Sequence, residues 1–374
     1  MTTLKADSKR ILEEFQELTS VDCISFQERA IADRLKKKLT ALGFTVEEDD
    51  AGEFYGSDTG NLYGYLPGTL PGPPILLSAH MDTVEPGCGK KAVVHEDGRI
   101  TSAGDTILGA DDVCGLVEIL EGIRILKEQG IPHRAVEVLF PVAEELFIKG
   151  TNRFDFGRIR AKEAYVLDLS NEVGTAALRA PSLISFCINV KGKSAHAGFN
   201  PEEGIHAIQL MSRAIGSLPV GRIGDDTTLN IGTIQGGNLV NIVPDTCTCR
   251  GEIRSYSHEK ALQTLKMVRH TFETILEGTG GSFSCESEVN LVAYEVKEEE
   301  PVVRQFVKAC QALGISPKLT STFGGSDNNN FALHGIRGIV LSCGMYQCHS
   351  VEEYTTLEDL NKGASLIATI LTQY

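Results

Sequence analysis

Residues 75–84 read ILLSAHMDTV, an apolar run that is followed at once by His80 and Asp82. Short apolar runs of this kind are typical of strands that are buried in a sheet. Four further apolar runs also carry or precede acidic or imidazole side chains: ILGADDVCGL with Asp111, VEVLFPVAEEL with Glu144 and Glu145, AYVLDLS with Asp168, and IVLSCGMYQCHS with His349. In an open α/β sheet, ligands bind beyond the carboxyl ends of the strands. The sequence therefore predicts that these side chains converge on one catalytic site.

The order of the apolar patterns predicts two domains. Up to about residue 176, strand-like runs alternate with helical patterns, which indicates an α/β sheet. The first two helices are amphipathic, and Ser25 followed by Glu28 is typical of a capping box at the start of the second. Residues 180–293 instead show the β-α-β-β-α-β order of a ferredoxin-like domain, which has its helices on one face of its sheet. Residues 1–179 and 294–374 are therefore predicted to form one domain, into which residues 180–293 are inserted.

Composition excludes several classes of partner. The formal charge of −15 argues against binding to nucleic acid, which requires clustered Lys and Arg. No stretch is long and apolar enough to span a bilayer, the N-terminus lacks the apolar core of a signal peptide, and no motif for nucleotide cofactors is present. The ten cysteines form no C-x-x-C pair, and several lie inside apolar runs, as is typical of buried thiols in a reducing compartment. We expect a cytoplasmic protein.

The acids and histidines at the strand ends match the ligands of a two-metal site. A catalytic zinc ion takes three protein ligands, usually imidazole nitrogens and carboxylate oxygens, and keeps one position for water. If Asp111 bridges, one ion has His80, Asp111 and Asp168, and the other has Asp111, Glu145 and His349. Two divalent ions are therefore predicted, most simply Zn, with Co or Mn as alternatives because carboxylate-rich sites accept several metals.

Two carboxylates remain for other roles. Asp82 lies two residues after His80, where it could hold the second imidazole nitrogen and fix the tautomer. Glu144 could take a proton from the bridging hydroxide or water as general base and deliver it to the leaving amine as general acid. Taken singly, such residues are more often a core imidazole, a solvated helix start or a helix cap. Their joint occurrence favours the metal site.

The motifs, taken in order, resemble those of a known enzyme family. HMDTV, GADD, the EE pair, YVLD, KGKSAHAG, GGNLVNIVPD, FGGSDNNN and CHS, which cover residues 75–355, are similar to the di-zinc exopeptidases that include peptidase T, aminoacylase and glutamate carboxypeptidases. GADD, the aspartate at position 168 and the overall layout resemble the peptidase T branch, the tripeptide aminopeptidases. The resemblance implies a mixed-sheet catalytic domain with an inserted lid domain, and hydrolysis of short peptides.

The resemblance also implies roles for residues of the lid and its neighbourhood. His196 would stabilise the oxyanion, often across a homodimer contact, while Asn241 and Arg254 would contact the carboxylate end of the substrate. A turn at Gly325 would line the substrate pocket, and the peptide bond after Asp111 would be cis. Alternation along the strand places Arg254 opposite a cysteine-rich side, which we expect the helices to cover.

Other functions remain open at the level of sequence. An N-acyl amino acid deacylase or a carboxypeptidase would use the same metal ligands with a different pocket. A catalytically silent peptide-binding relative would keep the fold, although Glu144 argues against this. A hydrolase with a nucleophilic cysteine or serine has little support. Cys348 stands beside His349, but adjacent residues on a strand would point to opposite faces.

Overall fold

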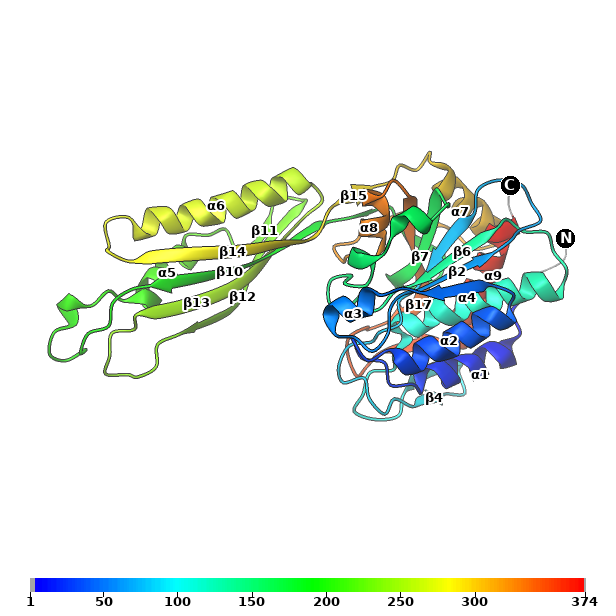
Figure 1. Cartoon of the computed structure of the whole chain (residues 1–374), viewed down its shortest axis with the longest axis horizontal. Coiled ribbons are helices and arrows are strands. Elements are labelled where there is room, and N and C mark those ends of the chain that lie inside the picture. Colours follow the sequence, from blue (N-terminus) through cyan, green and yellow to red (C-terminus); the bar gives the residue numbers. More distant parts are fainter. Residues whose placement is uncertain (1–3, 373–374) are drawn as a thin grey trace. The chain divides into compact units, whose positions relative to one another are not determined.

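The computed structural model describes residues 4–372, which form two compact units (Figure 1). The first unit contains the chain up to Arg179, then Glu295–Thr322, and the chain from Ser326 onward. The second contains Ala180–Tyr294 together with the short segment Phe323–Gly325. Within the described residues, no helix combines the length and apolar character needed to cross a membrane.

A sheet of eleven strands forms the centre of the first unit. Nine of them follow the path β1-β2-β6-β3-β7-β17-β18-β5-β4, while β8 pairs with β17 and β16 pairs with β8. Their bounds are β1 Thr45–Glu48, β2 Leu62–Leu66, β3 Ile75–Ser78, β4 Ala92–Val94, β5 Arg99–Ser102, β6 Val136–Phe140, β7 Glu163–Ser170, β8 Thr175–Ala177, β16 Lys318–Thr320, β17 Arg337–Tyr346 and β18 Tyr354–Thr356. Parallel and antiparallel pairs both occur, so the predicted mixed α/β sheet is confirmed.

Four neighbouring strands in the middle of this sheet, β6, β3, β7 and β17, run parallel to one another. Ile75 at the start of β3 lies opposite Val136 of β6 and Glu163 of β7. All residues of β3 and β6 are buried, as expected for parallel strands whose two faces are both covered. The carboxyl ends of the four strands therefore lie along one edge of the sheet.

Seven α-helices of the described residues belong to the first unit. They are α1 Ser8–Thr19, α2 Arg29–Ala41, α3 Ala51–Tyr55, α4 Ala110–Glu128, α7 Pro301–Ala312, α8 Asn328–Leu333 and α9 Leu357–Thr372. Helix α4 packs on β3, β7 and β17 and also against α1 and α9. Gly363 of α9 lies close to α4, and a Cβ atom there would lie 2.0 Å from the carboxyl carbon of Glu118.

The two amphipathic helices near the N-terminus are confirmed, but the capping box predicted at Ser25 and Glu28 is wrong. Helix α2 starts at Arg29, and the Glu28 side chain makes no capping hydrogen bond. Instead the Ser25 hydroxyl donates to Asp82 Oδ2 at 2.7 Å, and Glu28 Oε1 accepts the backbone N–H of Ala143 at 2.9 Å. Contacts with distant segments have replaced the local ones that the sequence pattern favoured.

The second unit has the predicted ferredoxin-like order with one additional short strand, β11, at the edge of its sheet. Its sheet runs β11-β12-β13-β10-β14, and all of its pairs are antiparallel. The elements in chain order are β10 Ser182–Lys191, α5 Ala207–Gly216, β11 Gly221–Ile223, β12 Thr227–Gly236, β13 Thr246–Ser255, α6 His258–Leu276 and β14 Ser282–Leu291. A third, two-stranded sheet pairs β9 (Arg179–Ala180) with β15 (Tyr294–Glu295).

Both helices of the second unit contribute to one core on one face of its sheet (Figure 1). Cys247, Cys249 and Ile253 of β13 belong to this core with residues of α5 and α6. The expectation that the helices cover the cysteine side of β13 is therefore confirmed.

Candidate metal centre

Five candidate ligands from five separate segments meet at the carboxyl edge of the parallel strands. His80 follows β3 by two residues, and Asp111 lies in the first turn of α4. Glu145 belongs to the turn after β6, and His349 to the loop after β17. Asp168 lies within β7, two residues before the last residue of the strand, rather than beyond its end. The structure thus brings together every side chain that the sequence analysis named as a metal ligand.

Asp111 is placed between the two histidines. Its Oδ1 lies 3.1 Å from Nε2 of His80, and its Oδ2 lies 3.3 Å from Nε2 of His349. On the side of His80, Asp168 Oδ1 lies 3.9 Å from the same imidazole nitrogen. On the side of His349, Glu145 Oε1 lies 2.9 Å from Nε2. One carboxylate therefore faces two separate sets of donors with its two oxygens.

These donors form two groups that suit a pair of cations. The first is His80, Asp111 and Asp168, and the second is Asp111, Glu145 and His349; within each, one potential ligand atom per residue lies within 4.8 Å of the others. Imidazole nitrogen and carboxylate oxygen are the donors that zinc and similar divalent ions accept. His349 is exposed while His80 is buried, so solvent reaches the second group more readily.

The electrostatics of the cluster also suit a cation. Burial raises the pKa of Asp168 well above its usual value, and Asp111 adds to this shift. Hydrogen bonds that the imidazole donates to Asp111 and Glu145 raise the pKa of His349 to about 11. Carboxylates crowded in a buried site disfavour their own ionisation unless positive charge is close. A divalent ion would supply that charge in place of the imidazole protons.

Asp82 holds the turn that carries the two glutamates. Its Oδ1 accepts the backbone N–H of Glu144 at 2.9 Å, and its Oδ2 accepts that of Glu145 at 3.2 Å. The predicted contact with His80 is also present but longer, since Nδ1 lies 3.3 Å from Asp82 Oδ1 and 2.9 Å from the Asp82 carbonyl oxygen. Asp82 thus contacts the imidazole and orients the adjacent pair of acids at the same time.

Glu144 has the electrostatic character that a proton shuttle needs. Burial raises its pKa well above the usual value for glutamate, and the nearby Asp168 raises it further. A carboxyl group with a raised pKa can exchange a proton near neutral pH.

Sequence reasoning did not identify three residues that support this site. Asp112 Oδ2 accepts the backbone N–H of His80 at 3.1 Å, and Ser25 and Glu28 bond to Asp82 and Ala143 as described above. Asp112 could have been suspected from its place beside Asp111. Ser25 and Glu28 gave no such signal, because their local pattern is that of an ordinary helix start.

The second unit carries His196 and Asn241, which lie side by side on two loops. An isolated antiparallel bridge joins His196 to Ile242, and the N–H of Ala197 donates to the Asn241 carbonyl oxygen at 3.0 Å. The His196 ring packs at 4.2 Å from the ring of Phe199, whose side chain is 84% exposed.

Arg254 and Gly325 also belong to the second unit, where both take part in local packing. Arg254 pairs with Glu252 at 2.9 Å, and its Nη1 donates to the Phe323 carbonyl oxygen at 2.8 Å. At Gly325 an added Cβ atom would lie 2.0 Å from Cδ1 of Leu291. A side chain at Gly325 would therefore force the Leu291 side chain to move, besides hindering the approach of substrate that the resemblance implied.

The cis peptide bond expected after Asp111 is confirmed.

The geometry disfavours a cysteine nucleophile, since the imidazole of His349 faces Asp111 and Glu145, whereas Cys348 Sγ lies 3.4 Å from the hydroxyl of Ser170. Burial raises the pKa of the Cys348 thiol far above its usual value.

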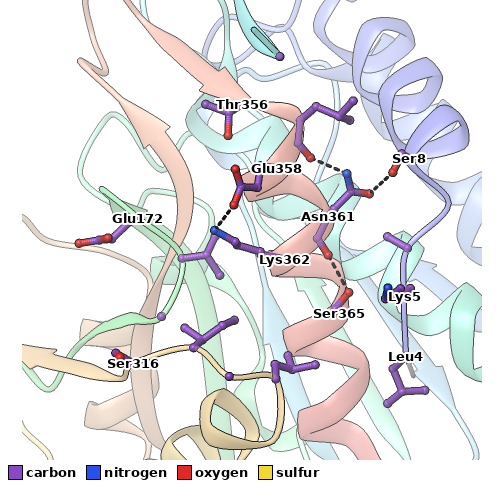
Figure 2. Close-up of a pocket in the computed structure, with 18 of the residues that line it drawn as sticks. Leu4, Lys5, Ser8, Glu172, Ser316, Thr356, Glu358, Asn361, Lys362 and Ser365 are labelled. Carbon is purple, nitrogen blue, oxygen red and sulfur yellow. Dashed lines mark hydrogen bonds and ion pairs between the residues drawn. The ribbon is translucent and has the colours of Figure 1, made fainter. Parts of the chain in front are cut away.

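A cavity of about 1180 Å³ lies elsewhere in the first unit, and Figure 2 shows residues that line it. It is lined by residues of the N-terminal segment, α9 and the loops at Glu172 and Ser316. Its Glu358 and Lys362 form an ion pair with each other, and Lys318 pairs with Glu172. None of the predicted site residues is among the described residues that line this cavity.

Comparison with known proteins gives matches over nearly the whole chain. Residues 180–280 match the peptidase dimerisation domain, and residues 61–170 match peptidase family M28. The uncharacterized protein YqjE of Bacillus subtilis is 38% identical, with 98% of this chain and 99% of that protein covered.

Two solved structures are also similar. The aminopeptidase PepT of Bacillus cereus shares 38% identity with a TM-score of 0.93, and a tripeptidase of Staphylococcus aureus shares 33% identity with a TM-score of 0.96. Each comparison covers 98% of both chains.

Proposed function

The chain belongs to the peptidase T-like family of metallopeptidases, and from this premise we propose that it removes the N-terminal residue from short peptides, with tripeptides as the main substrates. It is a metal-dependent peptide hydrolase. The observation that carries the proposal is Asp111, whose two oxygens face His80 and His349 separately. Such a carboxylate suits a bridge between two ions.

In the proposed site, His80, Asp111 and Asp168 hold one divalent ion, and Asp111, Glu145 and His349 hold the other. When bound, such ions lower the pKa of water and polarise the scissile carbonyl. We propose zinc as the native metal, because imidazole and carboxylate are donors that it prefers. Asp82 orients His80 through Nδ1 and fixes the turn of Glu144 and Glu145 through two backbone hydrogen bonds.

Glu144 is the proposed general base and general acid. Its carboxylate takes a proton from the attacking water, and its carboxyl group returns a proton to the nitrogen of the leaving amine. The raised pKa of Glu144 supports the second half of this cycle, because a group that holds its proton near neutral pH can deliver it. In the second unit, His196, Asn241, Arg254 and Gly325 remain proposed substrate contacts, on the strength of the motif resemblance.

The proposal is tested with a panel of di-, tri- and tetrapeptides, each with a free or an acetylated N-terminus. After removal of metal with a chelator, the protein is assayed without metal and with zinc, cobalt or manganese. We expect tripeptides with a free N-terminus to be cut after their first residue, and only when metal is present. Product analysis by mass spectrometry identifies the end that is cut. Preferential release of acetate, or of the C-terminal residue, would contradict the aminopeptidase proposal in favour of a deacylase or a carboxypeptidase.

We also propose that the second unit mediates a homodimer. Its residues 180–280 match the peptidase dimerisation domain, and apolar side chains in its loops are exposed, including Leu239 and Val240 at 62% and 105%. Sedimentation equilibrium of the whole chain should give twice the monomer mass of 40.5 kDa. Replacing both Leu239 and Val240 with serine should shift the equilibrium toward the monomer; a monomeric wild-type protein at micromolar concentration would contradict the proposal.

All ten cysteines are free thiols in the structure. This supports the proposal that the protein works in the reducing cytoplasm.

A further inference from the structure

Glu353 is a buried residue next to the candidate metal centre that has no part in the proposed proton transfers. Glu353 is 1% exposed and lies in the loop between β17 and β18, four residues after the candidate ligand His349. Its Oε2 accepts the backbone N–H of Gly109 at 2.7 Å, and its Oε1 accepts that of Asp111 at 2.9 Å. Each oxygen of this side chain thus holds one end of the three-residue segment that presents Asp111.

These two N–H groups lie at the start of α4, where a helix has no backbone acceptors for its first donors. The backbone is also irregular there. Gly109 has a φ of +79°, and Asp111 has the non-helical pair φ −84° and ψ 100°. The regular hydrogen bonds of a helix therefore do not fix the direction of the Asp111 side chain. The Glu353 side chain can fix it, because its two oxygens accept the backbone N–H groups at the two ends of the segment.

The loop that carries Glu353 also carries a ligand. The strands β17 and β18 pair antiparallel, with Met345 opposite Thr355, and the N–H of Glu353 closes a turn on the Ser350 carbonyl oxygen at 3.1 Å. His349 lies in the same loop and directs Nε2 to Asp111 Oδ2. One hairpin loop therefore provides the candidate ligand His349 and also, through Glu353, accepts a hydrogen bond from the backbone of Asp111.

We propose that Glu353 is a positioning residue of the metal centre, which keeps both oxygens of Asp111 aligned with the two histidines. This inference rests on the proposed two-metal site and deepens it. Partners that orient metal ligands typically change metal affinity about 10–100-fold when they are replaced. A role in folding alone would change the stability of the protein without changing its affinity for metal.

The chain offers a matched control for this distinction. Glu137 of β6 is 0% exposed, and its carboxylate also accepts backbone N–H groups, those of Arg160 and Ala161, at 2.9–3.1 Å. It lies near the start of β6, away from the carboxyl edge where the ligands meet. Replacing either glutamate with glutamine keeps the shape of the side chain but puts an amide N–H where a carboxylate oxygen accepted a backbone N–H.

The test compares the wild-type chain with Glu353→Gln and Glu137→Gln. Zinc affinity is measured by competition with a chromogenic chelator, the cobalt-loaded proteins are compared by visible absorption, and thermal unfolding is followed without metal. We expect E353Q to bind zinc about 10–100-fold more weakly and to show an altered cobalt spectrum. E137Q should lose thermal stability but keep the affinity and the spectrum of the wild type.

The outcomes distinguish the positioning role of Glu353 from the existence of the metal site. If E353Q binds zinc with wild-type affinity and shows the wild-type cobalt spectrum, the positioning role is wrong while the metal site stands. If the wild-type protein itself takes up no divalent ion, the proposed function fails, and this inference with it. Should E353Q fail to fold, Glu353→Asp keeps the charge but shortens the reach; unchanged zinc affinity in E353D would overturn the proposal.

Discussion

Replacing Glu144 with glutamine should abolish nearly all turnover while both metal ions stay bound. The glutamine side chain keeps the size of glutamate but can neither take a proton from water nor return one to the leaving amine. Positioned acid–base groups contribute about 10²–10⁴-fold to the rate, so we expect a loss of kcat within that range. Glu144 belongs to neither group of candidate ligands, which is why the metal content should not fall.

Glu145, the neighbour of Glu144, provides a matched control. Glu145→Gln makes the same chemical change one position along the same turn, but Glu145 contacts His349 within the second group. This variant should lose one ion, as measured by elemental analysis after dialysis, as well as activity. Turnover of Glu144→Gln at the wild-type level would remove Glu144 from the mechanism, and loss of metal from this variant would make it a ligand.

Replacing Asp111 with alanine should remove both ions and reduce hydrolysis to the background rate. Asp111 is the one residue that the two groups share, so its loss leaves each ion with two protein ligands. It would also leave two imidazoles without the carboxylate that each now faces. The ratio of metal to protein after dialysis, together with peptide hydrolysis, measures the effect.

Asp168→Ala is the matched variant, because Asp168 belongs to the first group only. It should keep about one ion per chain, bound by Asp111, Glu145 and His349. If Asp111→Ala and Asp168→Ala lose the same amount of metal, Asp111 does not bridge the two ions. Far-ultraviolet circular dichroism of both variants checks that the fold is kept.

The sequence predicted much of this architecture because strand ends in α/β sheets have a common geometry. Apolar runs such as ILLS in β3 identify buried parallel strands, and the residues that follow them meet at one edge. The β-α-β-β-α-β order of the second unit was equally readable, since periodicity distinguishes its helices from its strands. The end of a strand is predicted less well: Asp168 was expected at the end of its strand, but β7 continues past it to Ser170.

The supporting residues could not be predicted in the same way. Ser25 and Glu28 have the local pattern of a capping box, but their side chains bond to Asp82 and to the N–H of Ala143, residues that are distant in the sequence. Glu353 likewise lies 242 residues after Asp111, to whose backbone it bonds. Hydrogen bonds between such distant segments depend on the folded backbone and leave no periodic trace in the sequence.

The position of β17 in the sheet has a consequence for how the protein is made. This strand pairs in parallel with β7, yet the ribosome synthesises it only after the whole of the second unit. The inserted unit is almost continuous in sequence and can fold as soon as it has emerged, whereas the first unit still lacks a central strand at that stage. Until β17 docks, β7 has an unpaired edge, and unpaired edges attract other chains. The nascent chain therefore exposes this edge of β7 until the strand that precedes His349 has been synthesised and pairs with it.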